Sequence, residues 1–174
     1  MILSVASGKG GTGKTTISAS LAVVQADRGA PSAYVDCDVE EPNGHIFLKP
    51  SLESTETVTV PVPRIDERAC TNCGACAEFC RYNALACLPD GVLVFEELCH
   101  GCGGCSLACP AEAITEEGRA IGVVERGTAG NVRYLGGRLE VGEAMATPVL
   151  RALKAALPND GLSVLDAPPG TSCP

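Results

Sequence analysis

The chain of 174 residues is long enough for one sizeable domain or two small ones, and its 45% hydrophobic content is that of a globular protein. Its net charge of −8 argues against a nucleic-acid-binding surface, which needs clustered lysine and arginine. No stretch approaches the roughly 20 apolar residues that span a bilayer, and the apolar start leads directly into a glycine-rich loop instead of a secretory cleavage site. We therefore expect a cytoplasmic protein with no membrane attachment.

The first motif along the chain is a phosphate-binding loop, GKGGTGKT at residues 8–15. It satisfies the pattern G-x-x-x-x-G-K-[ST], in which backbone N–H groups cradle phosphate oxygens. In this pattern Lys14 reaches the β and γ phosphates, and Thr15 supplies its hydroxyl to Mg²⁺. An additional lysine, Lys9, directly follows the first glycine, and the general pattern does not require it.

The elements around this loop predict a βαβ unit. Residues 1–6 form a short apolar run typical of a buried parallel strand. Ile17, Leu21 and Val24 fall at helical spacing and predict a helix over residues 14–27, with Gly29 where it would end. Residues 32–36 (SAYVD) predict the second strand. Strand, loop, helix and strand imply a parallel sheet with helices on both faces.

A cysteine-rich internal repeat follows. Residues 70–85 (CTNCGACAEFCRYNAL) match residues 99–114 (CHGCGGCSLACPAEAI), and both have the spacing C-x2-C-x2-C-x3-C. A pair of zinc sites is the alternative, but zinc usually takes two C-x2-C pairs separated by a longer loop. The spacing is that of bacterial ferredoxins, in which the fourth cysteine of each run ligates the other cluster. It predicts two [4Fe–4S] clusters, one held by Cys70, Cys73, Cys76 and Cys109 and the other by Cys99, Cys102, Cys105 and Cys80.

Other features of this segment bear on its chemistry. Cys37, Cys87 and Cys173 lie outside the repeat, and a buried small side chain is expected for each. Arg81 follows Cys80 where the ferredoxin pattern has proline, and a cation there would raise the potential of the cluster that Cys80 serves. Residues 64–118 hold nine acidic side chains against three arginines, so this part of the chain is strongly acidic.

After residue 118 the pattern returns to the α/β type. Residues 119–126 and 132–139 predict strands, and residues 162–165 predict a buried strand that ends in Asp166. Residues 143–157 carry a helical stripe of core residues, namely Met145, Val149, Leu150, Leu153 and Leu157. The sequence stops soon after Asp166, although such a sheet normally needs further strands to cover both faces. We expect the domain to continue beyond this point.

The motifs together resemble a known family. Their order is KGGTGKTT, YVDCDVEEPN, the two cysteine runs and VLDAPPGTSCP. This order is similar to that of the deviant P-loop ATPases, which include MinD, ParA, the nitrogenase iron protein and the Mrp-type iron–sulfur proteins. It most resembles the MinD-superfamily ATPases with an inserted two-cluster ferredoxin domain. The resemblance implies an α/β P-loop NTPase fold with a doubly wound, mostly parallel sheet, C-terminally incomplete, over residues 1–61 and 119–174. A bacterial-ferredoxin-like α+β domain would be inserted at residues 62–118.

The same resemblance implies roles for individual residues. Lys9 would be the signature lysine that reaches across a nucleotide-sandwich homodimer to the partner's phosphates. Asp38 would orient the attacking water, and Asp166 matches the Walker B aspartate. The predicted catalytic residues are Lys9, Lys14, Asp38 and Asp166. The predicted ATP-phosphate site is Gly8, Lys9, Gly10, Gly11, Thr12, Gly13, Lys14, Thr15 and Thr16; the magnesium site is Thr15, Asp36 and Asp166; and the γ-phosphate switch is Pro168, Pro169 and Gly170.

The function implied is that of an ATP-binding iron–sulfur protein. In full length it would be an ATP hydrolase that couples nucleotide state to electron transfer, and its acidic ferredoxin-like surface would dock a basic redox partner. One alternative is an iron–sulfur carrier or assembly ATPase of the Mrp type. Another is a positioning ATPase of the MinD or ParA kind in which the clusters are structural. The amide-forming synthetases of the same superfamily lack a ferredoxin insert, so the cysteine repeat argues against them.

Overall fold

A computed structural model describes residues 1–170 and divides the chain into two compact units. The first unit comprises Met1–Val58 and the stretch from Ile121 onward, and the second comprises Thr59–Ala120. The second unit therefore contains all eight cysteines of the repeat.

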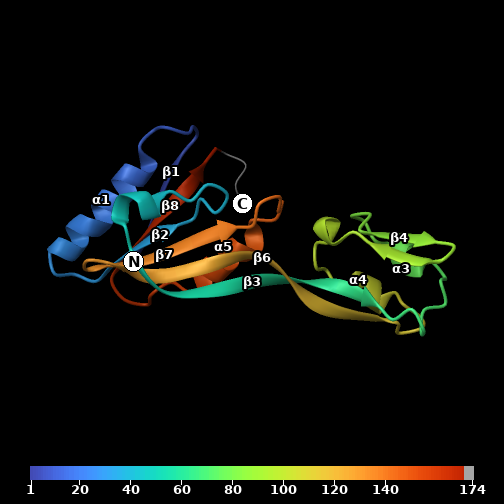
Figure 1. The fold of residues 1–174 in the computed structure, drawn as a ribbon. Helices are drawn as coiled ribbons and strands as arrows, with labels where there is room; N and C mark the ends of the chain where they lie inside the picture. The colour runs from blue at the N-terminus through green and yellow to red at the C-terminus, as the bar shows by residue number, and fades with distance from the viewer. Residues whose placement is uncertain (171–174) are drawn as a thin grey trace. The chain divides into compact units, whose positions relative to one another are not determined.

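The main sheet has six strands in the order β1-β8-β2-β7-β6-β3 (Figure 1). The pairs β1/β8, β8/β2 and β2/β7 are parallel, and β7/β6 is the antiparallel hairpin among the pairs of this sheet whose register is known. A mostly parallel α/β sheet is thus confirmed, whereas the sequence did not indicate the antiparallel hairpin. The bounds are β1 Ile2–Ser7, β2 Ser32–Asp36, β3 Ser51–Ile65, β6 Ile114–Ala129, β7 Val132–Leu139 and β8 Leu162–Pro169.

Helices cover both faces of this sheet. α1 (Lys14–Asp27) packs on β2 and β8, and α5 (Thr147–Ala155) packs on β7. Successive residues of β7 show that the two faces differ: a Cβ at Gly136 would strike the Tyr134 ring, whereas one at Gly137 would strike Leu153 of α5. Among the described residues, no helix is long and apolar enough to cross a membrane.

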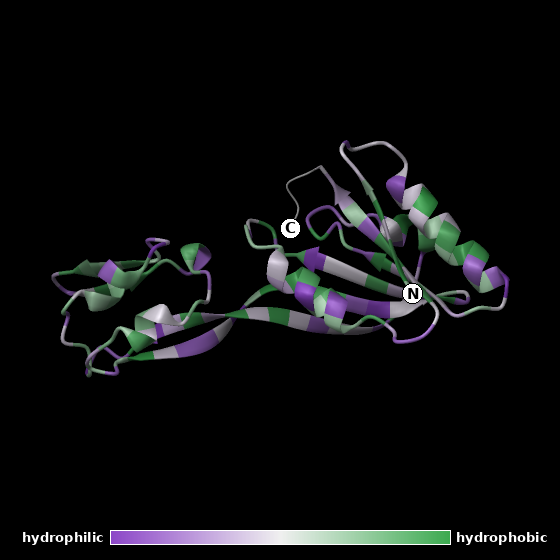
Figure 2. Ribbon diagram, turned by 180° about the vertical axis from the view of Figure 1, so that it is seen from behind, coloured by the Kyte–Doolittle hydropathy of each residue, from purple (hydrophilic) through white to green (hydrophobic). Residues whose placement is uncertain are grey.

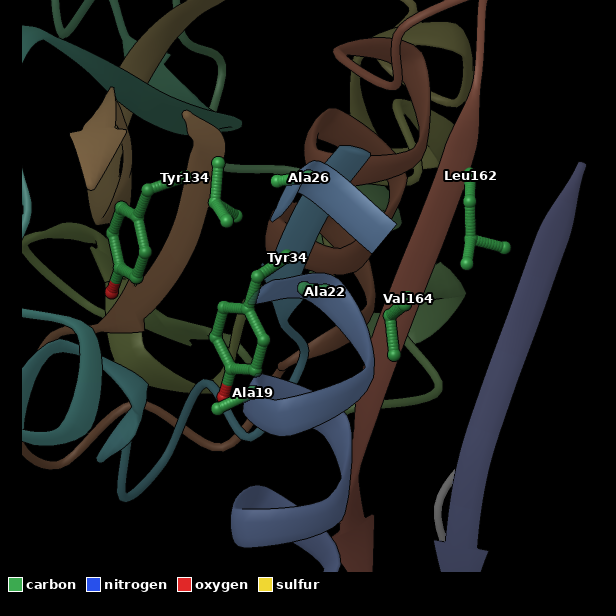
Figure 3. Packing of buried hydrophobic residues seen from close by; sticks show 8 residues of the cluster. Ala19, Ala22, Ala26, Tyr34, Tyr134, Leu162 and Val164 are labelled. Atoms are coloured by element: carbon green, nitrogen blue, oxygen red, sulfur yellow. The ribbon is translucent and has the colours of Figure 1, made fainter. Parts of the chain in front are cut away.

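The inward face of α1 differs from the stripe that predicts the helix. α1 buries its alanines, including Ala19 and Ala22, against Tyr34 and Val164 (Figure 3). The larger residues of the predictive stripe stay substantially exposed: Ile17 is 52%, Leu21 38% and Val24 48% exposed. Alanine has no side chain beyond Cβ, so its face of the helix can approach the tyrosine rings closely. Between its hydrophilic ends, α1 is largely apolar (Figure 2), so the hydropathy pattern did not identify the buried face.

Other boundaries shift for local reasons. α5 begins at Thr147, later than the predicted residue 143, and has proline in its first turn, a position that suits that residue. β8 continues through Asp166 to Pro169 instead of ending at Asp166. A short helix, α2 (Gly44–Leu48), and most of the long polar strand β3 were not predicted.

The second unit repeats one structural pattern twice. Its elements, beyond its parts of β3 and β6, are α3 (Ala75–Phe79), α4 (Gly104–Leu107), the 3-10 turn Glu96–Leu98 and the hairpin of β4 (Leu85–Leu88) and β5 (Gly91–Val94). Left-handed backbone occurs at Asn72, Gly74 and Asn83, and again at the equivalent Gly101, Gly103 and Glu112.

Hydrogen bonds also repeat between the two halves. The N–H of Asp66 donates to the carbonyl of Ala113 at 2.8 Å, and the N–H of Phe95 donates to the carbonyl of Ala84 at 2.8 Å. Asp66 is the repeat equivalent of Phe95, and Ala84 is the repeat equivalent of Ala113. The duplication that is visible in the sequence is therefore a duplication of backbone conformation.

Candidate functional site

The phosphate loop joins the end of β1 to the start of α1. Gly11 and Gly13 have φ of 71° and 84°, a region that L side chains rarely adopt. Ser7 Oγ donates to the carbonyl of Lys9 at 2.7 Å, and Thr12 Oγ1 donates to Ser7 Oγ at 2.8 Å. Ser7, which sequence reasoning did not single out, thus bonds to two residues of the loop, Lys9 and Thr12.

The loop is open for a ligand along its glycines. A Cβ built on Gly8, Gly10, Gly11 or Gly13 would meet no heavy atom within 4 Å. The N–H of Ile17 donates to the carbonyl of Gly13 at 3.0 Å, and the amides before it belong to the first turn, which has no partner inside the helix. Such amides, together with the positive end of the helix dipole, suit a phosphate group.

Two buried aspartates stand side by side near this loop. Asp36 of β2 is in register with Asp166 of β8, and they are 0% and 2% exposed. The N–H of Gly170 donates to the carbonyl of Ser7 at 3.1 Å, so the end of β8 contacts the base of the loop. In open α/β sheets ligands bind at the carboxyl ends of the parallel strands, which is the edge that these aspartates occupy.

The carboxylate of Asp36 organises the loop that follows it. Oδ1 accepts the N–H of Asp38 at 3.2 Å, and Oδ2 accepts those of Asn43 at 3.1 Å and Gly44 at 2.8 Å. Burial raises the pKa of Asp36 to about 7, although the amide bonds from Gly44 and Asp38 oppose the shift. Asp38 is half-buried, and burial also raises its pKa. Oδ1 of Asp36 therefore serves the segment just after β2, and Oδ2 serves the start of α2.

Asp166 accepts hydrogen bonds from two hydroxyl groups. Ser18 Oγ of α1 lies 3.2 Å from Oδ1, and Tyr34 Oη of β2 lies 2.9 Å from Oδ2. Sequence reasoning missed both donors. The SAYVD segment indicated only a strand, and no spacing rule connects positions 34 and 166.

The two predicted cysteine sets line two separate cavities in the second unit. Each cavity brings together three cysteines of one run and the last cysteine of the other. Residues 1–170 contain no group of three His, Cys, Asp or Glu side chains arranged to hold a single metal ion. One cavity is lined by Cys70, Cys73, Cys76 and Cys109, and the other by Cys99, Cys102, Cys105 and Cys80, in each case with other residues.

Close packing of α3 on α4 accounts for the crossing of the fourth cysteines. A Cβ on Gly104 of α4 would lie 2.1 Å from the ring of Phe79, so the absence of a side chain at Gly104 allows this close approach. Phe79 ends α3 and immediately precedes Cys80, which reaches the cavity of the other run. The helix contact thus joins the two cysteine runs.

Backbone amides point at sulfur atoms in both sets. The N–H of Ala84 lies 3.4 Å from Cys80 Sγ, and its repeat equivalent Ala113 lies 3.3 Å from Cys109 Sγ. The N–H of Asn72 lies 3.4 Å from Cys70 Sγ. Donors of this kind stabilise thiolate ligands.

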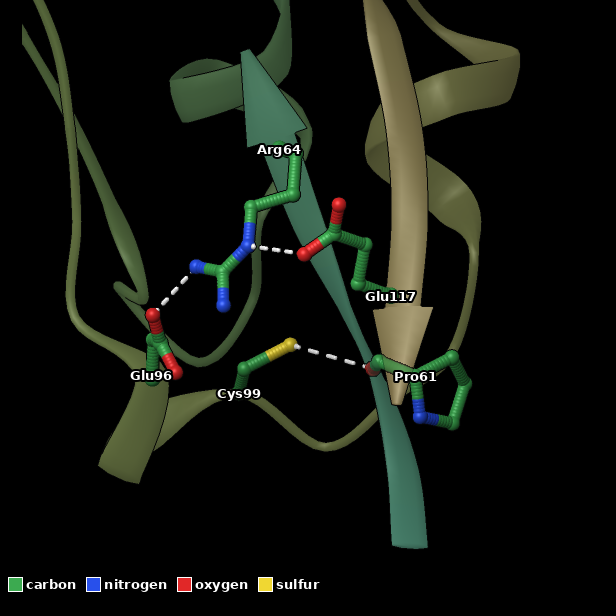
Figure 4. A network of polar contacts seen from close by, with 5 residues as sticks. All are labelled: Pro61, Arg64, Glu96, Cys99 and Glu117. Carbon is green, nitrogen blue, oxygen red and sulfur yellow. Dashed lines mark hydrogen bonds and ion pairs between the residues drawn. The ribbon is translucent and has the colours of Figure 1, made fainter. Parts of the chain in front are cut away.

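The surroundings of the two cavities differ. Arg81 and the stacked pair of Tyr82 and His100, with ring centroids 3.7 Å apart, line the cavity of Cys80. Beside it, Cys99 Sγ is 3.9 Å from the carbonyl oxygen of Pro61 (Figure 4). No charged side chain lines the other cavity among the described residues.

An ion-pair network lies in the same unit. Arg64 donates to Glu96 and, at 2.9 Å, to Glu117 (Figure 4). These contacts connect β3 and β6 to the 3-10 turn before Cys99. These ion pairs tie down the turn that precedes the second cysteine run. The count of charged residues in the sequence did not reveal them.

The cysteines outside the repeat behave differently from one another. Cys87 is exposed, so the expectation of a buried side chain is wrong for it; its Sγ lies on the β4–β5 hairpin, 3.0 Å from Asn72 Oδ1. A two-stranded hairpin leaves such positions open to solvent. Cys37 is half-buried, and Cys173 lies outside the described residues.

The fold and the phosphate loop define a nucleotide-binding domain of the P-loop class. Residues 3–159 match the CobQ/CobB/MinD/ParA nucleotide binding domain, and the chain belongs to that family. The matched range ends before β8. Asp166 itself lies beyond the matched range, in register with Asp36 of β2.

Relatives among curated proteins come from Methanocaldococcus jannaschii. The chain is 30% identical to the uncharacterized protein MJ0579, over 99% of this chain and 63% of that protein. It is 33% identical to the uncharacterized protein MJ0578, over 100% of this chain and 62% of that protein. A shorter match, 56% identical over 26% of this chain and 17% of the relative, is to the uncharacterized ATP-binding protein MJ0547. The chain thus spans less than two thirds of the length of MJ0579 and MJ0578.

Proposed function

We propose that this chain is the nucleotide- and cluster-binding part of an iron–sulfur ATPase that couples ATP state to electron transfer through two [4Fe–4S] clusters. The observation that carries the proposal is the pair of cavities, each lined by four cysteines drawn from both runs. Nucleotide binding alone has no need for eight thiols arranged in this way.

The ATP side of the proposal is supported by the open glycine loop and by the amides at the start of α1, which have no partner inside the helix. Two relatives with short matches to this chain, MJ0547 and MJ0169, are described as ATP-binding. The phosphates would accept hydrogen bonds from the amides of residues 8–16, and Lys14 would balance the charge of the β and γ phosphates. The hydroxyl of Thr15 fits Mg²⁺, which prefers oxygen ligands, and the carboxylate of Asp166 would accept a hydrogen bond from magnesium-bound water.

Hydrolysis would use the aspartate that follows β2. The Asp38 carboxylate would orient a water molecule toward the γ-phosphate and accept a hydrogen bond from it. The N–H of Asp38 is held by Oδ1 of Asp36, which supports a fixed position for this residue. Lys9 is exposed beside the loop, as a lysine that reaches a partner's phosphates must be. In the proposed homodimer it would stabilise the charge that builds up during phosphoryl transfer.

The donor set of the cysteine cavities fits iron–sulfur clusters. Eight thiols at ferredoxin spacing, with amides directed at Cys70, Cys80 and Cys109, are the surroundings that such clusters require. A cluster bound in each cavity would supply one-electron transfer. The chain itself would hold the sulfurs, exclude water with neighbouring apolar residues and present an acidic surface to a basic redox partner.

Metal analysis of the anaerobically purified chain tests the cluster assignment. We expect about eight iron and eight sulfide per chain. Cys99→Ser should lower the iron content by about half, because this residue lines only one of the cavities. Cys87→Ser is the matched control, since Cys87 is outside both cavities and should leave iron unchanged. One or two zinc ions per chain in place of iron would refute the assignment.

Redox titration monitored by EPR tests the coupling. We expect MgATP to shift the potential of at least one cluster by about 59 mV, a tenfold change for a one-electron couple. If nucleotide binds without a shift, the coupling is wrong and the chain is a carrier or a positioning ATPase. Cluster transfer to an apo-acceptor only with MgATP would identify the carrier. Unchanged ATP hydrolysis after removal of the clusters would identify the positioning ATPase.

A further inference from the structure

The two hydroxyl donors to Asp166 are not equivalent. Ser18 Oγ lies 2.9 Å from the carbonyl of Lys14 and 3.2 Å from Oδ1 of Asp166. A serine hydroxyl has one proton and donates to one of these acceptors at a time. Its contact with the carbonyl of Lys14 is the shorter of the two. The Tyr34 hydroxyl lies 2.9 Å from Oδ2 of Asp166 and donates its hydrogen bond to that oxygen. Tyr34 is therefore the steadier of the two donors.

Tyr34 is held rigidly by its surroundings. Its side chain is fully buried, and its ring stacks on Tyr134 with centroids 6.1 Å apart and an interplanar angle of 16° (Figure 3). Burial raises the pKa of its hydroxyl, and the neighbouring carboxylates Asp36 and Asp166 raise it further. A tyrosine hydroxyl is protonated at neutral pH even at its ordinary pKa of about 10, so it is available as a donor to Asp166.

The Tyr34 hydroxyl also contacts the segment that Asp36 organises. A Cβ on Gly44 would lie 2.3 Å from both Oη and Cε1 of Tyr34, so the backbone of α2 rests directly on the ring. The amide of the same Gly44 donates to Asp36 Oδ2. One side chain thus touches both Asp166 and the far end of the segment that contains Asp38.

We propose that Tyr34 is a positioning residue of the magnesium site, because its hydroxyl fixes the Asp166 carboxylate. With Oδ2 held by Tyr34, Oδ1 is the oxygen left to accept a hydrogen bond from magnesium-bound water. Oδ1 faces Ser18 on α1, the helix that also carries Thr15. The inference rests on the proposed binding of MgATP and adds to it a residue that acts through Asp166 and touches neither metal nor nucleotide.

The test compares Tyr34→Phe with Tyr134→Phe. Both substitutions keep a buried aromatic ring and remove one hydroxyl, but only the first removes a hydrogen bond to Asp166. The affinity of the full chain for ATP is measured by calorimetry, once with EDTA and once with saturating Mg²⁺. The ratio of the two dissociation constants gives the contribution of magnesium, and a general loss of structure would not change this ratio selectively. Circular dichroism confirms that each variant is folded.

We expect Tyr34→Phe to reduce the magnesium contribution about tenfold, the equivalent of about 1.4 kcal/mol, while ATP affinity in EDTA changes less than about twofold. Tyr134→Phe should behave as the unchanged protein, and Ser18→Ala should give a smaller reduction than Tyr34→Phe. An unchanged ratio in Tyr34→Phe, or an equal loss in Tyr134→Phe, overturns the inference and leaves the proposed function standing. Absence of any ATP binding by the unchanged protein overturns both.

Discussion

Gly44 offers a sharp test of how tightly α2 packs on Tyr34. Its φ lies outside the left-handed region, so alanine can adopt the backbone conformation and the cost of Gly44→Ala is steric. The new Cβ would lie 2.3 Å from Tyr34 Cε1 and 2.6 Å from Cζ. The ring cannot move aside freely because it is fully buried and stacked on Tyr134. Overpacking of this kind costs about 1–3 kcal/mol.

Gly10→Ala is the matched control. Gly10 also lies outside the left-handed region, and a Cβ there meets no atom within 4 Å. Thermal unfolding of both variants should therefore show a fall of about 2–4 °C per kcal/mol for Gly44→Ala and no change for Gly10→Ala. ATP binding should be weakened more by Gly10→Ala than by Gly44→Ala, because the new methyl group at Gly10 projects from the open phosphate loop. Equal stability of Gly44→Ala and the unchanged protein, within about 0.5 kcal/mol, would refute this reasoning.

Two further predictions concern stability. Burial raises the pKa of Asp36 to about 7, above about 3.9 in the unfolded chain, so the folded state binds the extra proton between these values. This contribution to stability is complete below about pH 4 and is lost as the pH rises through about 7. In magnesium-free buffer, Asp36→Asn should therefore flatten the slope of melting temperature against pH. An unchanged slope would contradict the assignment. Leu153→Ala should cost about 2–5 kcal/mol in urea unfolding, because Leu153 is 1% exposed beneath β7. Val24→Ala, 48% exposed on α1, should cost less than about 1 kcal/mol, and similar costs for the two variants would show that the buried faces are misassigned.

Much of the candidate site could be predicted because its information is local. The phosphate loop is a run of consecutive residues whose glycines have one dominant use. The strand over residues 32–36 and the helix over residues 14–27 were predicted with the bounds that the structure has. The division of eight cysteines into two sets also followed from spacing, and the structure lines one cavity with each set. Their use as cluster ligands is still a prediction.

The buried face of α1 could not be read from hydropathy. Branched residues at helical spacing occupy one side of the helix and the alanines occupy the opposite side, so both sides look apolar. The choice between them depends on the two tyrosine rings of β2 and β7, which leave room only for small side chains. Close packing of a particular surface, and not the amount of hydrophobicity, decides which residues are buried.

The sequence by itself determined the class of domain, the phosphate loop and the grouping of the cysteines, because each is written in the spacing of neighbouring residues. Only the tertiary structure decided what the buried aspartates do. Asp166 and Tyr34 are separated by 132 positions and meet through one hydrogen bond, and Asp36 is committed to the amides of α2. A hydrogen bond depends on distances of about 3 Å, and such distances between remote residues exist only after the sheet has brought β2 and β8 together.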